Sequence, residues 1–158
     1  MKIKLGVFFG GKSVEHEVSI ITALQAIENM NKEKYDIVPI YIAKDNKMYC
    51  GDFVDDIKQY TNIDNLKRIS TQVTLSLKDN KTVLLRTNKK FYENEVYDYI
   101  DVAFPIVHGT NVEDGTLQGY LKMFNLPYVG CDVTSSAVGM DKYVSKTILK
   151  ENNIPVLD

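Results

Sequence analysis

Side chains that could carry chemistry gather in residues 105–120. An apolar run is followed there by His108 and Gly109, and a polar loop leads to Glu113 and Asp114. In an open parallel α/β sheet, ligands bind beyond the carboxyl ends of strands. A carboxylate beside the imidazole would raise its pKa and fix its tautomer. The stretch therefore predicts a ligand-binding turn, although a histidine after a strand can also be a purely structural residue.

A second candidate turn follows the apolar run 3–9, where Gly10 and Gly11 end the first expected strand. Residues 6–13 fit the letters of a phosphate-binding P-loop, G-x-x-x-x-G-K-[ST]. A P-loop needs its four variable residues in a loop whose N–H groups face phosphates. Here those positions are Val, Phe, Phe and Gly within an apolar strand. The better interpretation is a glycine turn that opens the backbone and the next helix N-terminus to a ligand.

The helix after this turn begins with hydroxyl and acidic side chains. Ser13 can cap it, and Glu15 and Glu17 lie at or near its first turn. The two carboxylates either complement the helix dipole, or one of them faces the cleft and pairs with a ligand ammonium. Farther along, Asp141 and Lys142 have the pattern of a helix start, with the acid in the first turn and the lysine outside.

Apolar periodicity predicts an α/β fold with an open, mostly parallel sheet flanked by helices. A strand at 3–9, a helix at 15–30 and a strand at 35–42 form a βαβ unit with a right-handed crossover. The apolar side chains of this helix that should face the sheet are Val18, Ile21, Ala23, Leu24, Ile27 and Met30.

Residues 44–98 are less regular and more polar, and they are interpreted as an insertion of short, mainly antiparallel strands at the sheet edge. The strands expected there are 47–50, 71–77, 82–86 and 91–97, with a short helix at 52–60. The core then resumes with a strand at 101–107, a helix at 115–124, a brief strand at 126–130, and helices at 132–140 and 141–153. In the last helix, Val144, Ile148 and Leu149 are expected to face inward.

Composition excludes several function classes. The 158 residues carry a formal net charge of −2, which gives no reason to expect nucleic acid or an anionic membrane as a partner. No apolar run approaches the ~20 residues of a membrane span, and the N-terminus lacks the pattern of a signal peptide. Cys50 and Cys131 lie in no metal-binding pattern, so we expect two reduced thiols in a cytoplasmic protein without membrane insertion.

Three blocks of this sequence, in order, resemble the D-alanine–D-alanine ligase family of the ATP-grasp superfamily. Residues 9–19, FGGKSVEHEVS, are similar to the family's N-terminal signature, and residues 108–119, HGTNVEDGTLQG, to its HG…GEDG-[ST]-[LI]-QG turn. The third block covers 127–130 and 135–142. One departure is Val112, which stands where the family has glycine. Because a β-branched residue disfavours positive φ, we expect the backbone of this loop to differ.

The resemblance implies a pre-ATP-grasp, Rossmann-like substrate domain at residues 1–130, including the variable insertion at 44–98. Residues 131–158 would be the start of a truncated central ATP-grasp domain. The implied enzyme belongs to bacterial peptidoglycan precursor synthesis and is a homodimer. It uses ATP and Mg²⁺ to phosphorylate the carboxylate of one D-alanine, and the amine of a second D-alanine attacks the acyl phosphate. Because the family's enzymes are much longer, we expect this chain to be an N-terminal fragment, inactive alone.

The resemblance also implies roles for single residues. Glu15 would orient the first D-alanine through its ammonium, and His108 would lie beside that substrate to hold and polarise it. Lys142 would approach the ATP phosphates, and no metal ligand is assigned in this chain. The implied substrate-binding residues are Gly10, Gly11, Ser13, Glu15, His108 and Gly109.

Alternatives remain open at this point. A related ligase could join D-alanine to D-serine or D-lactate, because the residues that select the second substrate would lie downstream. A different ATP-grasp enzyme could share the N-terminal fold. A stand-alone ligand-binding module without a catalytic half is the alternative from another class.

Overall fold

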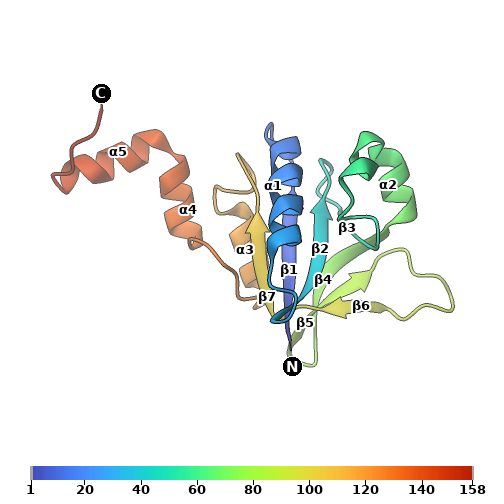
Figure 1. The fold of residues 1–158 in the computed structure, drawn as a ribbon. Helices are drawn as coiled ribbons and strands as arrows, with labels where there is room; N and C mark the ends of the chain where they lie inside the picture. The colour runs from blue at the N-terminus through green and yellow to red at the C-terminus, as the bar shows by residue number, and fades with distance from the viewer. Residues whose placement is uncertain (1, 158) are drawn as a thin grey trace.

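Figure 1 shows the computed structural model, which describes residues 2–157, as one mixed β-sheet with helices on both faces. The strands are β1 (Ile3–Gly10), β2 (Tyr35–Ile42), β3 (Met48–Cys50), β4 (Thr71–Lys78), β5 (Lys81–Arg86), β6 (Val96–Tyr99) and β7 (Val102–Ile106). The helices are α1 (His16–Asn29), the 3₁₀ helix η1 (Ile57–Thr61), α2 (Ile63–Ile69), α3 (Thr116–Met123), α4 (Val133–Met140) and α5 (Lys142–Glu151).

The strand order is β6-β5-β4-β3-β2-β1-β7. Strand β1 pairs in parallel with β2 on one side and β7 on the other, and all other neighbours pair antiparallel. The predicted α/β class is confirmed, and the antiparallel strands β3 to β6 come from the predicted insertion. Because the chain winds outward from β1 in two directions, the carboxyl ends of β1 and β7 flank a topological switch point, where open α/β sheets bind ligands.

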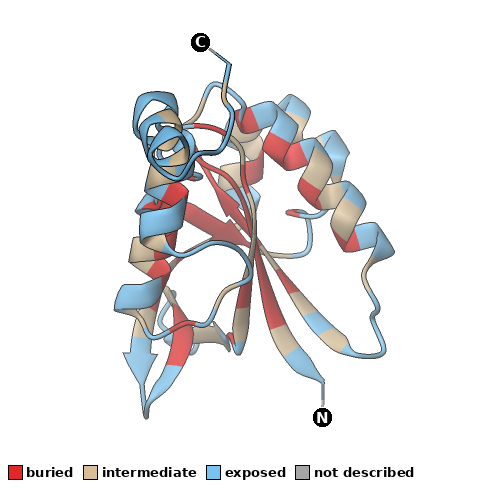
Figure 2. Cartoon of the chain, turned by 90° about the vertical axis from the view of Figure 1, so that its left-hand side faces the viewer, coloured by how far each residue is buried: buried red, intermediate tan, exposed pale blue. Residues whose placement is uncertain are grey.

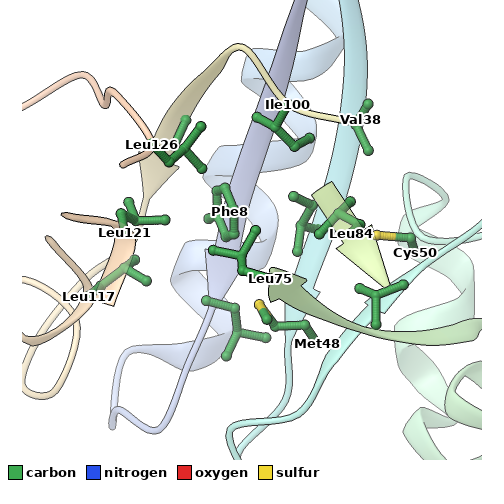
Figure 3. Packing of buried hydrophobic residues seen from close by; sticks show 14 of the residues in the cluster. Phe8, Val38, Met48, Cys50, Leu75, Leu84, Ile100, Leu117, Leu121 and Leu126 are labelled. Carbon is green, nitrogen blue, oxygen red and sulfur yellow. The ribbon is translucent and has the colours of Figure 1, made fainter. Parts of the chain in front are cut away.

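Strand β1 is the centre of the core. Val7, Phe8 and Phe9 are fully buried, and alternate residues of a strand face opposite sides of the sheet. Val7 and Phe9 pack in the cluster below α1 and α2, whereas Phe8 packs with α3 and the insertion strands (Figure 3). Figure 2 shows the buried residues concentrated along these strands. The P-loop interpretation is therefore excluded, because its variable residues lie inside a buried strand.

Helix α1 buries much of the predicted face. Ala23 and Ile27 are buried, and Leu24 and Met30 pack partly buried against the same cluster, but Val18 and Ile21 are each 49% exposed. The polar Ser19, fully buried on the inner face, replaces them. The prediction was wrong for Val18 and Ile21, because the helix turns Ser19 and Ile20 toward the sheet instead, and the hydroxyl of Ser19 forms hydrogen bonds with the strand ends described below.

Part of the predicted insertion also differs. Helix α2 was not predicted; it buries only Leu66, so its apolar period is weak, and Asn62 caps it by accepting a hydrogen bond from Asn65 N at 3.0 Å. The expected helix at 52–60 is replaced by turns and the later 3₁₀ helix η1. The expected strand at 91–97 begins only with β6, because Phe91 is fully exposed and contributes nothing to the core.

The brief strand expected at 126–130 is reduced to a single bridge between Ala103 and Tyr128. Asp132 caps α4 by accepting from Ser135 N at 2.7 Å. Asp141 caps α5 with hydrogen bonds from Tyr143 N and Val144 N, which confirms the helix-start pattern.

Helices α4 and α5 project away from the sheet (Figure 1). The expectation that α5 turns Val144 and Ile148 inward is wrong for this chain, since these residues are 37% and 44% exposed and α5 has no buried residue. Among residues 2–157, no helix combines the length and the apolar character needed to cross a membrane.

Candidate functional site

The turn after β1 requires glycine. Gly10 and Gly11 have φ values of +91° and +92°, a region that side chains strongly disfavour. A Cβ on Gly10 would collide with the carbonyl oxygen of Ile42. Gly11 N donates a hydrogen bond to the same carbonyl at 2.7 Å, so the turn is fastened to the end of β2.

Ser19 fastens the same turn from the other side. Its hydroxyl accepts a hydrogen bond from Gly10 N at 2.7 Å and donates one to the carbonyl of Ile106 at 2.6 Å. One fully buried oxygen thus joins α1 to the carboxyl ends of β1 and β7. These are the two strand ends on either side of the switch point.

We expect Ser19→Ala to lower the free energy of unfolding by about 2–5 kcal/mol, because it removes the side-chain partner of the buried Gly10 N–H and of the partly buried Ile106 carbonyl. The matched control is Ser70→Ala. The buried Ser70 hydroxyl has no hydrogen-bond partner within residues 2–157, so its removal should cost less than about 0.5 kcal/mol. Urea denaturation of both variants measures the difference, and equal losses would contradict this reading of Ser19.

His16, at the start of α1, links the glycine turn to β2 through both of its ring nitrogens. Its Nδ1 lies 2.6 Å from the carbonyl of Gly11 and its Nε2 lies 3.0 Å from the hydroxyl of Tyr41. Because a carbonyl only accepts, Nδ1 carries the proton, and the neutral Nε2 accepts from Tyr41. Burial lowers the pKa of His16 and outweighs the opposing effect of the Gly11 hydrogen bond.

The lowered pKa of His16 predicts a pH dependence of stability. The unfolded chain, with an ordinary histidine pKa of about 6.5, binds the proton more readily than the folded one. The contribution of His16 is therefore complete above about pH 6.5 and decreases as the pH falls toward the folded value. We expect His16→Gln to flatten the decrease in unfolding free energy between pH 7.5 and pH 5.5, as measured by denaturation at both pH values. A parallel decrease in the two proteins would contradict this assignment.

The two predicted turns lie against each other. Ser13 Oγ accepts a hydrogen bond from Glu15 N at 3.0 Å, as a local turn before α1; Ser13 is not the helix cap, a position that Glu15 holds. A Cβ on Gly109, which has φ +86°, would collide with Ser13 Oγ and lie 2.9 Å from Glu15 Oε2. The absence of a side chain at Gly109 is therefore what allows this close approach.

The carboxylates Glu15 and Glu17 have different surroundings. Glu17 forms an exposed ion pair with Lys44 at 2.7 Å, and the hydrogen bond from Lys44 lowers the pKa of Glu17. Within residues 2–157, the exposed carboxylate of Glu15 has no hydrogen bond or ion pair, and it lies beside Gly109. Of the two acids at the start of α1, Glu15 is thus the one placed at the junction of the turns with its charge uncompensated.

His108 has a hydroxyl neighbour instead of the expected carboxylate. Its Nε2 lies 3.0 Å from Oγ1 of Thr22 on α1. Glu113 accepts a hydrogen bond from Gly109 N, and Asp114 accepts hydrogen bonds from backbone N–H groups of the loop and of the start of α3. Sequence reasoning missed Thr22, because a threonine within a helix gives no sign of a partner 86 residues away.

The acids of the second turn brace its backbone. Asp114 accepts from Asn111 N at 2.7 Å and from Thr116 N at 3.1 Å. Partial burial opposes ionisation of Asp114, but these hydrogen bonds outweigh it and hold the pKa of its carboxyl below the ordinary value. Glu113 and Asp114 thus hold the backbone of the loop, and Asp114 also accepts from the first residue of α3.

Val112 joins the second turn to the first. The positive φ in this loop falls on Asn111, at +66°, and the side chain of Val112 is buried. A Cβ on Gly11 would lie 2.5 Å from Cγ1 of Val112, and Asn111 Nδ2 donates to the carbonyl of Lys12 at 3.0 Å. Valine at this position therefore packs directly on the glycine turn.

Lys142 lies outside this arrangement. It is exposed at the start of α5, and Figure 1 shows that helix standing apart from the turns after β1 and β7. Within the part of the chain that the structure describes, no three His, Cys, Asp or Glu residues form a group that could hold a metal ion.

The strand order and the two turns together define an open α/β domain whose candidate site lies at the switch point of its sheet. Residues 4–131 match the model of the family described as D-ala D-ala ligase N-terminus. The chain belongs to this family.

Relatives agree with this assignment. The chain is 42% identical to the D-alanine–D-alanine ligase of Thermosipho melanesiensis, over 99% of this chain and 42% of that protein. The D-alanine–D-alanine ligase structure from Coxiella burnetii is 36% identical, with a TM-score of 0.84, over 99% of this chain and 43% of that one. The chain thus spans about two fifths of the length of the relatives it matches.

The structure of the VanG D-Ala:D-Ser ligase from Enterococcus faecalis is also similar, with 30% identity and a TM-score of 0.77 over 100% of this chain and 44% of that one. A ligase structure from Bacillus anthracis complexed with ATP has 30% identity and a TM-score of 0.59, over 99% of this chain and 38% of that one.

Proposed function

We propose that this chain is the substrate-binding portion of an ATP-dependent D-alanine–D-alanine ligase of peptidoglycan precursor synthesis. The observation that carries the proposal is the position of the Glu15 carboxylate beside the Gly109 turn, where a Cβ on Gly109 would lie 2.9 Å from Oε2, at the switch point of a domain of this family. Residues 1–130 would form the substrate domain, and 131–158 would begin the central ATP-grasp domain. The whole enzyme is proposed to be a cytoplasmic homodimer without membrane insertion.

The proposed binding mode follows from charge and space. The uncompensated carboxylate of Glu15 would hold the ammonium of the first D-alanine, since a charged pair is the strongest hydrogen bond available to an amino acid at this surface. Gly10, Gly11 and Gly109 would let the two turns lie close together beside the substrate, and Ser13 would add a hydroxyl there. His108 would help to hold and polarise the substrate from the neighbouring turn.

ATP would supply the phosphoryl group that activates the first substrate's carboxylate, and Mg²⁺ would neutralise the phosphates. Lys142 is proposed to approach those phosphates. Most of the nucleotide site and all of the metal-binding carboxylates would lie in the part of the protein beyond this chain. We therefore expect that the chain alone does not catalyse ligation.

A second candidate is a ligase that joins D-alanine to D-serine, which the likeness to the VanG structure favours. The residues that select the second amino acid would lie downstream, so the residues of this chain do not distinguish a D-alanine–D-alanine ligase from a D-alanine–D-serine ligase.

The test is ligation by the full-length protein with ATP and Mg²⁺. We expect D-alanine-dependent release of ADP and phosphate, and mass spectrometry should identify D-alanyl-D-alanine as the product. Offering D-serine or D-lactate together with D-alanine separates the related ligases. A full-length protein that releases no phosphate with any of these substrates would contradict the proposal, as would turnover by residues 1–158 alone.

A further inference from the structure

One threonine hydroxyl on α1 lies against the imidazole of His108. Oγ1 of Thr22 is 3.0 Å from Nε2 of His108. The same oxygen lies 3.0 Å from the carbonyl of Val18 and 3.2 Å from the carbonyl of Ser19. A hydroxyl has one proton and two lone pairs, so these three neighbours compete for a single donor.

The carbonyls of Val18 and Ser19 determine the direction in which the Thr22 hydroxyl donates its proton. Carbonyl oxygens can only accept, and threonine within a helix commonly donates to a carbonyl three or four residues earlier. When Thr22 donates to Val18 or Ser19, it presents a lone pair to His108, and Nε2 must then carry a proton to complete the hydrogen bond. We propose that Thr22 is a positioning residue that keeps Nε2 of His108 protonated, which leaves Nδ1 as the ring nitrogen available to a ligand.

The assignment determines what His108 offers to a ligand. Within residues 2–157, Nδ1 makes no hydrogen bond, so it is the nitrogen left for an incoming molecule. With Nε2 held by Thr22, Nδ1 accepts from a ligand N–H when the ring is neutral and donates to a ligand oxygen when the ring is charged. This step rests on the proposed function, in which the ligand is an α-amino acid that carries both an ammonium and a carboxylate. Thr22 selects the ring nitrogen without touching the substrate.

The opposite arrangement gives a different site. If Thr22 donated to an unprotonated Nε2, the neutral ring would carry its proton on Nδ1 and could only donate to the ligand. Thr22 would then have to rotate before the ring could become charged. The two arrangements are distinguished by which nitrogen of the neutral ring is protonated.

The test uses the full-length protein with ¹⁵N-labelled histidine, as wild type, Thr22→Val and Thr22→Ser. Valine keeps the branched shape and removes the hydroxyl, whereas serine keeps the hydroxyl. Long-range ¹H–¹⁵N spectra at a pH where the ring is neutral identify the protonated nitrogen, and the signals of His108 are those lost in His108→Gln. We expect protonated Nε2 in wild type and Thr22→Ser, and a mixture of both tautomers in Thr22→Val. A wild-type ring protonated on Nδ1, or a Thr22→Val spectrum identical to wild type, would overturn the assignment.

Kinetics give a second measurement on the same variants. We expect kcat/KM for D-alanine to fall about 10-fold in Thr22→Val and to be largely restored in Thr22→Ser. An unchanged kcat/KM in Thr22→Val, or an equal loss in both variants, would count against a positioning role. The spectra do not depend on turnover. A protein that makes no dipeptide but shows protonated Nε2 contradicts the proposed function alone, whereas an active protein protonated on Nδ1 contradicts only the role of Thr22.

Discussion

Glu15→Gln in the full-length protein is expected to lower kcat/KM for D-alanine by about 100-fold, because removing one partner of a close charge pair typically costs several kcal/mol. Glutamine has nearly the shape of glutamate, so the change removes charge and leaves the turn intact. The carboxylate has no other partner within residues 2–157, so its charge is free to hold a ligand ammonium. Initial rates of phosphate release over a range of D-alanine concentrations measure the loss.

The matched control is Glu17→Gln, two residues along the same helix. Glu17 is exposed and pairs with Lys44 at the surface, and such pairs contribute little. We therefore expect kcat/KM to stay within about twofold of wild type. Equal losses in the two variants would show that the general negative charge at the start of α1, and not the position of Glu15, attracts the substrate.

Gly109→Ala is expected to damage both stability and activity. The positive φ of this residue costs an alanine about 1–2 kcal/mol. Its Cβ would also displace Ser13 Oγ and the Glu15 carboxylate. We expect the unfolding free energy to fall by at least that amount, and kcat/KM for D-alanine to fall more than 10-fold because the ammonium partner is moved. Denaturation and initial rates measure the two effects separately.

Gly139→Ala is the control for this change. Gly139 lies in α4, and a Cβ there would have no atom within 4 Å. Alanine favours helix over glycine by up to about 1 kcal/mol, so this variant should be as stable as wild type or more so. If Gly109→Ala also left stability and activity unchanged, the close approach of the two turns would not be important for binding.

The sequence predicted the parts of the fold whose patterns are strong and local. The apolar runs that became β1, β2 and β7 and the i, i+3, i+4, i+7 spacing of α3 left little choice of element. Helix α2 escaped notice because it buries only Leu66. Val18 and Ile21 were wrongly assigned to the inner face of α1, because the period of apolar residues carries no information about buried polar residues such as Ser19.

The candidate site was predictable to the extent that its residues lie on short local motifs. Glu15 and Gly109 stand on two recognisable turns, and strand order brings these turns together. The supporting contacts were not predictable, because they join residues far apart in sequence. Ser19 and Ile106 are 87 residues apart, and Thr22 and His108 are 86 apart. No pattern within either segment announces its partner.

The interlocked turns have a consequence for binding entropy. Val112 packs on Gly11, and Asn111 donates to the carbonyl of Lys12, so neither loop can change shape without moving the other. We therefore expect both turns to be ordered when the domain folds, so that a ligand at their junction would not have to order them. Because loop ordering is one of the main costs of association, this would favour the proposed binding of a ligand as small as a single amino acid, which has few atoms to contribute favourable contacts.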